Sequence, residues 1–206
     1  MWGGSTGIKS ALIDGLYEVT EITGGQSFTF AEAGEHVVEI KFSTNTIPSG
    51  FSMGSGAPIV SVVIPSGIET INDTAFSGSN TLKEVVIPYT VTTVGYSAFG
   101  GCTNLESVTL PDSPIEFIAA PFGGCTNLKK ISIPKGVTGL NGGTFSGCNL
   151  EEVYIDTDEI PGGIFNGKSS LKTVTIGNNT KIIYGGSFSG SSNLTSVTIG
   201  KGVTDI

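Results

Sequence analysis

The sequence predicts a β-rich, right-handed solenoid in which short strands stack into a parallel sheet, with roughly one coil per leucine-rich repeat. Three observations predict it: phenylalanine and leucine recur at a fixed interval, apolar residues alternate with polar ones before a proline, and glycine is abundant. Glycine makes up 31 of 206 residues, about 15%, which is twice the usual ~7%. With 38% hydrophobic residues and a mean hydropathy of +0.21, the chain can still bury one sizeable core.

The repeat is visible in the spacing of two residue types. Phenylalanines and leucines each recur at a nearly constant interval, and only the interval from Phe145 to Phe165 is clearly shorter than the others. The period lies in the range of about 20–29 residues of leucine-rich repeats, whose stacked units bury a core that no single unit could form. The phenylalanines are Phe76, Phe99, Phe122, Phe145, Phe165 and Phe188, and the leucines are Leu82, Leu105, Leu128, Leu150, Leu171 and Leu194.

Each repeat begins with a predicted strand, in which apolar residues occupy every second position. Val85 and Ile87 are an example, and Pro88 ends this strand because proline lacks the N–H group that further pairing needs. Glycine supplies the tight corners at which φ is positive. A second apolar pair, spaced by three residues, is expected to face the core in the next segment: Ile68/Ile71, Val91/Val94, Ile115/Ile118 and Val137/Leu140.

Residues 36–206 are predicted to form the solenoid domain, with about eight coils of which the last is incomplete. In the diverged first coil, Val38 and Ile40 take the strand positions and Phe51 takes the phenylalanine position. The chain stops inside the last repeat, which leaves apolar residues without a covering coil. We therefore expect either a longer natural protein or a last coil that is covered by a second copy or by a partner.

Residues 1–35 are predicted to be an N-terminal segment and β-cap. Alternating residues on both sides of Gly24-Gly25 predict a β-hairpin, and residues 16–42 together are expected to cover the first coil. Repeat arrays need such a cap for solubility. The first residues do not combine a basic start with an apolar segment, so we expect any export signal to belong to a longer precursor.

Charge and composition exclude several functional classes. The chain has 10 lysines, no arginine and 18 acidic residues, which give a net charge of −8. This charge repels nucleic acid and anionic lipid, and the absence of arginine removes the bidentate fork that binds phosphate. No segment reaches the ~20 apolar residues of a membrane helix. We expect no nucleic-acid partner and no membrane insertion.

The three cysteines invite a reactive or metal-binding interpretation. Cys102, Cys125 and Cys148 each stand three residues after a phenylalanine, in one column of successive repeats. The same column holds serine in other repeats and Lys168 in the short one, so small buried side chains explain it and we expect reduced, structural cysteines. A disulfide between neighbouring coils is compatible with a coil spacing of ~4.8 Å, although three thiols cannot all pair.

The densest acidic patch spans residues 151–159. Asp156, Asp158 and Glu159 are weak candidates for a Ca²⁺ site, because the glycine and the distal glutamate of an EF-hand loop are missing. A solvated acidic surface is the simpler interpretation, and we expect no cofactor. A hydrolase would need paired carboxylates across a cleft, which nothing here indicates. The single histidine, His36, has no nucleophile motif near it, and we predict that the protein is not an enzyme.

The outward strand positions are the best candidates for a binding surface. Most of them are polar, as suits a pleated surface in water, but Val63, Val86 and Tyr154 are apolar or aromatic, and exposed aromatic residues often anchor ligands. Threonine rows are also compatible with ice binding, although Glu84 and Lys130 interrupt the flat array. We call the predicted binding residues the strand-face row: Val63, Val86, Thr109, Ser132, Tyr154, Thr175 and Thr198.

The repeat resembles that of BspA-like bacterial leucine-rich repeats, whose motif is a strand followed by I-P-x-x-V-T-x-I-G-x-x-A-F-x-x-C-x-x-L. Residues 86–105 carry it nearly whole, and six to seven copies cover residues 36–206. The resemblance implies a secreted or cell-surface bacterial protein. It implies a non-enzymatic adhesion or protein-binding module, whose sheet face binds host, matrix or other cell-surface proteins.

Two observations favour an alternative or a local departure. The uncovered last coil and the polar surface are compatible with a structural or assembly module, such as a spacer or a particle component that self-associates through that coil. The fifth repeat is shorter than the others and carries Asp156 where other repeats have proline. We therefore expect the shape near residues 151–165 to differ from that of the other coils.

Overall fold

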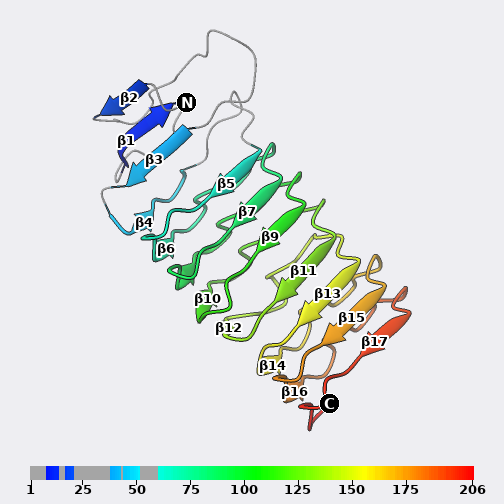
Figure 1. Ribbon diagram of the computed structural model, residues 1–206. Helices are drawn as coiled ribbons and strands as arrows, with labels where there is room; N and C mark the ends of the chain where they lie inside the picture. The colour runs from blue at the N-terminus through cyan, green and yellow to red at the C-terminus, as the bar shows by residue number, and fades with distance from the viewer. Residues whose placement is uncertain (1–7, 14–16, 21–37, 43, 52–59) are drawn as a thin grey trace.

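The structure is a computed structural model that describes residues 8–13, 17–20, 38–42, 44–51 and 60–206. From residue 44 onward the described chain winds into a parallel β-solenoid whose coils have the length that the sequence predicts (Figure 1). Each coil contributes one longer and one shorter strand, and these strands form two rows that run side by side along the solenoid from its N-terminal to its C-terminal end. Within the described ranges no helix has the length and apolar character to cross a membrane.

One side of the solenoid, which we call the strand face, carries the longer strands. They are β5 (Ser61–Val63), β7 (Glu84–Val86), β9 (Ser107–Thr109), β11 (Lys130–Ile133), β13 (Glu152–Ile155), β15 (Thr173–Ile176) and β17 (Ser196–Thr198). These strands form two parallel sheets, β5-β7-β9 and β11-β13-β15-β17. Among the described residues no strand pairing joins β9 to β11, so the sheet is interrupted in the middle of the face.

The return segment of each coil carries a shorter strand. These strands are β4 (Thr46–Ile47), β6 (Thr70–Ile71), β8 (Thr93–Val94), β10 (Ile115–Phe117), β12 (Val137–Thr138), β14 (Glu159–Ile160) and β16 (Ile182–Ile183). They stack in parallel in the order β4-β6-β8-β10-β12, and β14 pairs separately with β16. The gap between β12 and β14 falls in the short coil, where Phe145 and Phe165 are closer in sequence than the other neighbouring phenylalanines of the repeats.

Three antiparallel strands lie at the N-terminal end: β1 (Ile8–Ile13), β2 (Tyr17–Thr20) and β3 (Val38–Phe42), in the order β2-β1-β3. β1 and β2 pair in antiparallel orientation. β2 is part of the first arm of the hairpin predicted around Gly24-Gly25, and the turn and second arm of that hairpin lie outside the described residues. Phe42 packs edge-on against Phe51, with ring centroids 5.4 Å apart, and so joins this sheet to the solenoid core.

The structure corrects the assignment of Val38 and Ile40. Both residues lie in β3, which pairs with β1 in antiparallel orientation and does not extend the parallel stack. Alternating apolar residues are common to strands of both orientations, which explains the error. The domain boundary at residues 35 and 36 stays a prediction.

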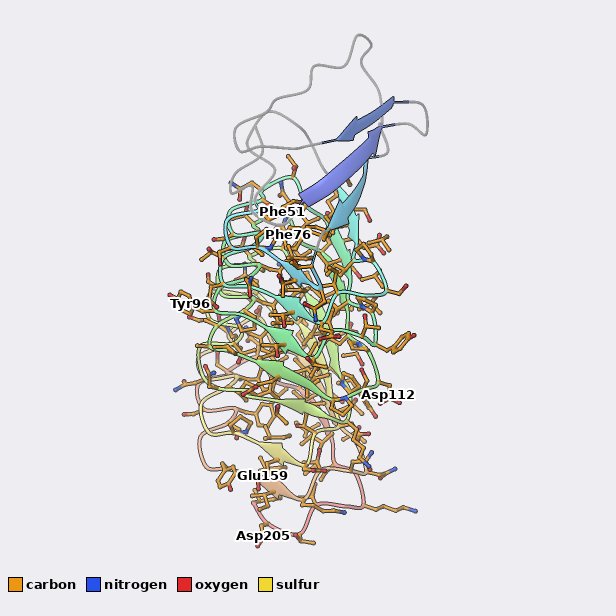
Figure 2. All side chains as sticks on the ribbon, turned by 90° about the vertical axis from the view of Figure 1, so that its left-hand side faces the viewer. Phe51, Phe76, Tyr96, Asp112, Glu159 and Asp205 are labelled. Atoms are coloured by element: carbon orange, nitrogen blue, oxygen red, sulfur yellow. The ribbon has the colours of Figure 1, made fainter. Side chains whose placement is uncertain are left out.

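A column of phenylalanine rings forms the centre of the core. The rings from Phe76 to Phe188 lie within 4–14° of parallel, and neighbouring centroids are 5.1–6.1 Å apart. Phe51 extends the column as predicted and meets Phe76 edge-on at 5.6 Å (Figure 2). Aromatic pairs at such distances contribute about 0.5–1.5 kcal/mol beyond the burial of their area. Because each ring contacts its neighbour, the column fixes how one coil stacks on the next.

A second column is formed by the side chains that stand three residues after the phenylalanines from Phe99 to Phe188. Each of these side chains donates a hydrogen bond to the carbonyl oxygen of the phenylalanine in the preceding coil. The distances are 3.1 Å for Cys102 Sγ to Phe76 O, 3.2 Å for Cys125 Sγ to Phe99 O, 3.1 Å for Cys148 Sγ to Phe122 O, 2.6 Å for Lys168 Nζ to Phe145 O and 2.9 Å for Ser191 Oγ to Phe165 O. The three thiols are free and buried. A buried carbonyl without a donor would cost about 1–3 kcal/mol, so this column stabilises each coil junction.

One predicted core position is wrong. Ile118, expected to face the core with Ile115, is 44% exposed, whereas Phe117 is buried and packs edge-on against Phe122 at 5.6 Å. Counted back five residues from the column phenylalanine, Phe117 occupies the position that Val94 holds in the preceding coil, and the two are in register. The spacing of three residues between Ile115 and Ile118 was therefore a coincidence of this coil.

Gly139 occupies a backbone position that glycine alone can fill. Its φ is +73°, and an added Cβ would collide with the carbonyl oxygen of Phe117. We expect Gly139→Ala to lower the free energy of unfolding by about 2 kcal/mol or more, since an L-residue in left-handed conformation already costs ~1–2 kcal/mol. Urea unfolding followed by circular dichroism measures this change.

Gly185→Ala is the matched control. Gly185 is also exposed, has no atom within 4 Å of an added Cβ, and does not have a left-handed φ. Its substitution should change stability by no more than about 0.5 kcal/mol. Equal losses in the two variants would contradict the close approach of the backbone at Gly139.

Candidate binding surface

All seven residues of the strand-face row lie on the strand face. Register aligns Val63, Val86 and Thr109 across the first sheet, and Ser132, Tyr154, Thr175 and Thr198 across the second. The interruption between β9 and β11 separates these two groups. The row is therefore two short rows of hydrogen-bonded strands, and the junction between them is the irregular part of the surface.

The side chains of this row differ in their exposure. Val63 is 74% exposed and Tyr154 is 40% exposed, which makes them the large apolar residues that a partner could cover. Val86 is half-buried, in spite of its outward strand position, and so offers less surface than the sequence suggests. Thr109, Ser132 and Thr198 are exposed, and Thr175 is half-buried.

A shallow groove of about 810 Å³ lies on the strand face at the interruption. Ser107 and Val108 of β9 line one side, and residues of β11, β13 and β15, including Tyr154, line the rest. The core is less tightly covered here than in neighbouring coils, since Val108 is 8% exposed whereas its equivalent Val85 is fully buried. The sequence analysis placed Tyr154 on this surface but did not predict the groove beside it.

Ion pairs neutralise the charges around the groove. Lys130 Nζ lies 2.9 Å from Glu152 Oε2, and both residues line the groove. Lys172 Nζ lies 2.7 Å from Glu151 Oε2, and this hydrogen bond and charge lower the pKa of the Glu151 carboxyl. These pairs are exposed and contribute little to stability. The charged residues that line the groove are Glu106, Glu152, Lys129 and Lys130, so the groove has no strong charge of either sign.

Asp156 influences the Tyr154 phenol at the groove. Burial raises the pKa of Tyr154 above its ordinary value, and the charge of Asp156 and a hydrogen bond to it raise the pKa further. The Tyr154 hydroxyl is therefore neutral, and the ring adds aromatic area to the groove without adding charge.

The weak metal candidates have other contacts. Asp156 accepts two hydrogen bonds from Asn179, at 2.9 Å from its backbone N–H and at 2.6 Å from its side-chain amide. Glu159 is exposed and accepts a hydrogen bond from Tyr184, and the charge of Glu159 raises the pKa of that phenol. Within the described ranges, no three His, Cys, Asp or Glu residues gather closely enough to hold a metal ion. The two hydrogen bonds from Asn179, which belongs to the next coil, show that Asp156 connects two coils.

Three exposed tyrosines were missed because they stand at corners and not at strand positions. Tyr89 is 73% exposed directly after Pro88, Tyr96 is 53% exposed, and Tyr184 is 46% exposed. An aromatic residue in a glycine- or proline-bounded corner is the signal that could have found them. Figure 2 shows Tyr96 on the side of the solenoid away from Asp112, which follows β9, so Tyr96 is not part of the strand face.

The last coil presents apolar side chains to solvent. Val197 is 50% exposed and Ile199 is 49% exposed, whereas their equivalents Val174 and Ile176 are buried. Self-association through this coil, which the sequence suggested, stays a prediction.

A parallel solenoid with stacked phenylalanine and leucine columns defines a leucine-rich-repeat protein, a class that generally serves as a non-enzymatic scaffold. The chain belongs to the family described as the BspA type leucine rich repeat region, of which six copies match over residues 44–159 and 104–206. The family resemblance found in the sequence is thereby confirmed. A search of the curated proteins finds no match.

Several solved structures share the fold. A leucine rich repeat protein of T. pallidum is 26% identical, with a TM-score of 0.54, 69% of this chain covered and 70% of that one. The pneumococcal vaccine antigen PcpA is 19% identical, with a TM-score of 0.57 and coverage of 79% and 46%. A leucine rich cell surface protein of Faecalibacterium prausnitzii is 22% identical, with a TM-score of 0.49. The match covers 73% of this chain but only 35% of the Faecalibacterium protein.

The hydrogen bonds of Asp156 predict a local stability effect. We expect Asp156→Ala to lower the free energy of unfolding by about 1.5–3 kcal/mol, because hydrogen bonds to charged groups are worth that much and both hydrogen bonds from Asn179 to Asp156 would be lost. Asp158→Ala is the control, since Asp158 is exposed, and it should change stability by no more than about 0.5 kcal/mol. Thermal or urea unfolding measures the stability of both variants. Equal losses of stability in the two variants would contradict the role of Asp156 in connecting the coils.

Proposed function

We propose that the protein is a non-enzymatic binding module that holds another protein on its strand face, as an adhesion protein does. The observation that carries this proposal is the groove at the interruption of the sheet, which is lined by the exposed side chain of Tyr154. Aromatic anchors at the centre of a surface commonly supply most of the binding energy. Val63, 74% exposed on the same face, adds a second apolar contact.

Charge supports a protein partner over other classes. The net charge of −8 and the absence of arginine disfavour nucleic acid and anionic lipid surfaces. In the groove itself, Lys130 forms an ion pair with Glu152. A secreted or cell-surface location and a host, matrix or cell-surface partner are part of the proposal. Membership of the BspA type family supports this part of the proposal, together with what the resemblance of the repeat motif implies.

The test is a binding titration against immobilised matrix proteins and host-cell glycoproteins, at moderate salt. We expect saturable binding by the parent protein and a Kd about 30-fold higher for the Val86→Ser/Tyr154→Ala variant. Such a change corresponds to the loss of about 2 kcal/mol expected for a central aromatic anchor. Circular dichroism of the variant verifies that the solenoid remains folded.

Tyr96→Ala is the matched control, because it removes an exposed tyrosine from the other side of the solenoid. This variant should bind like the parent. Binding that is lost in Tyr96→Ala and retained in the strand-face variant would move the site to the corners. Absence of saturable binding to every immobilised protein would contradict the adhesion function and favour the structural or spacer alternative.

A further inference from the structure

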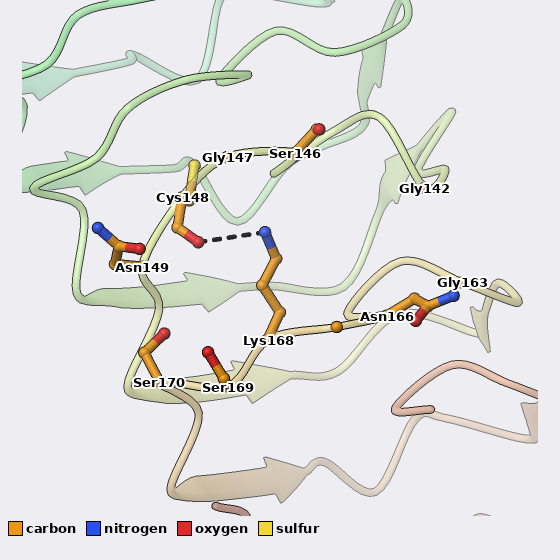
Figure 3. Close-up of a pocket in the computed structure, with 11 residues that line it drawn as sticks. Gly142, Ser146, Gly147, Cys148, Asn149, Gly163, Asn166, Lys168, Ser169 and Ser170 are labelled. Carbon is orange, nitrogen blue, oxygen red and sulfur yellow. Dashed lines mark hydrogen bonds between the residues drawn. The ribbon is translucent and has the colours of Figure 1, made fainter. Parts of the chain in front are cut away.

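The shortened fifth repeat creates a second irregular place, on the turns and away from the strand face. The turn Cys148-Asn149-Leu150 is one residue shorter than its equivalent at residues 125–128. Lys168, only 9% exposed, extends from its own coil into the space beside this turn (Figure 3). Its Nζ donates to the carbonyl oxygen of Phe145 at 2.6 Å and to that of Cys148 at 3.1 Å.

The two Asn-Gly pairs of the sequence, Asn141-Gly142 and Asn166-Gly167, lie at this place. Gly142 and both residues of the second pair line a notch of about 630 Å³ (Figure 3). Asparagine before glycine is prone to deamidation, because the glycine nitrogen can reach the asparagine Cγ without hindrance from a side chain. Water reaches both pairs through the notch, and Asn166 is more exposed than Asn141. Exposure alone would therefore select Asn166.

A hydrogen bond hinders the reaction at Asn166. The backbone N–H of Gly167 donates to the carbonyl oxygen of Ser189 in the next coil at 2.8 Å. The Gly167 nitrogen is the atom that would have to lose its proton and attack the side-chain amide of Asn166. The attack therefore needs the hydrogen bond between the two coils to break first.

The neighbouring coils do not hold the corner at Asn141 in this way. The N–H of Asn141 donates to Thr144 Oγ1 at 2.9 Å, within its own turn. On the other side of the corner, Pro161 of the next coil has no N–H to donate. In four other coils the equivalent N–H donates to the preceding coil, and these donors are Asn72, Gly95, Ile118 and Tyr184. The corner at Asn141 can therefore change its conformation without breaking such a bond between coils.

The side chain of Asn141 is folded over its own turn. Its Oδ1 accepts a hydrogen bond from the backbone N–H of Gly143 at 2.8 Å, and its Nδ2 donates to the carbonyl oxygen of Gly139 at 3.0 Å. An N–H that donates to Oδ1 stabilises the negative charge that develops on this oxygen during an attack on Cγ. Among the described residues the N–H of Gly142 has no acceptor. The attacking nitrogen is thus free, and the amide that it attacks is polarised.

We propose that Asn141 is a site of spontaneous deamidation and that the fold protects Asn166 from the same reaction. The Gly142 nitrogen loses its proton and forms a bond to the Cγ of Asn141. The Cγ–Nδ2 bond then breaks, and the amide nitrogen leaves as ammonia with the proton that Gly142 lost. Water opens the resulting cyclic imide at either carbonyl, which gives aspartate or isoaspartate.

The product changes the corner after β12. Both products add a negative charge there, and isoaspartate also lengthens the main chain by one atom, because the chain then runs through Cγ. The hydrogen bond from Gly143 to Oδ1 depends on the original geometry of the turn. This modification is independent of the function proposed for the strand face.

The test incubates the folded protein at mildly alkaline pH and follows both Asn-Gly pairs by peptide mapping and mass spectrometry. We expect Asn141 to deamidate at least about fivefold faster than Asn166, since one ordinary hydrogen bond on the attacking nitrogen slows the attack by about that factor. In guanidinium chloride, which unfolds the protein, the two rates should converge. Equal rates in the folded protein, faster reaction at Asn166, or a difference that persists after unfolding would overturn the proposal.

Gly142→Ala tests the attack by the Gly142 nitrogen. An added Cβ would lie 3.4 Å from the carbonyl oxygen of Gly163, and Gly142 does not have a left-handed φ, so this variant should fold. We expect deamidation of Asn141 to become slower by on the order of tenfold, because the methyl group hinders the approach to Cγ. Asn166 should keep its rate and is the internal control. An unchanged rate at Asn141, or a product without isoaspartate, would contradict the cyclic imide.

Discussion

The stacked phenylalanine column is the interaction on which the rest of the solenoid depends. Neighbouring rings lie 5.1–6.1 Å apart and nearly parallel, so each coil must bring its ring to the same place in the cross-section. The next residues are then fixed, because the side chain three positions later reaches the carbonyl of the preceding phenylalanine. The strands follow from this alignment, and any insertion or deletion has to be absorbed between one phenylalanine and the next.

The column also explains what could be predicted from the sequence. The regular interval between the phenylalanines indicated the coil length, because the same position is buried in every coil. The alternation of apolar and polar residues before each proline indicated the strands of the strand face. The same rule would have identified Phe117 as a core residue by its distance from Phe122. The local spacing of Ile115 and Ile118 predicted instead that Ile118 faces the core, although Ile118 is exposed. The antiparallel pairing of β3 could not be predicted, since alternation is the same in both orientations.

The candidate site shows a different limit. Strand periodicity placed all seven row residues on one face, because side-chain direction follows from the pleat alone. It could not reveal that β9 and β11 are unpaired, since pairing depends on backbone groups that every residue carries. The groove beside Tyr154 lies at that unpaired junction, where Val108 is 8% exposed. Nor does a strand pattern report on corners, where Tyr89 is exposed.

Both irregular places therefore have the same physical origin. A regular coil covers its neighbour completely, so its ladder hydrogen bonds and its core leave little that a ligand or a solute could reach. Where the β9–β11 pairing lapses, an aromatic side chain borders a groove. Where a turn loses one residue, the space is filled by the long side chain of Lys168 in place of a thiol or a hydroxyl. The ammonium group of Lys168 then takes over the role that a thiol or a hydroxyl has in the other coils, as the donor to the carbonyl oxygen of the preceding phenylalanine.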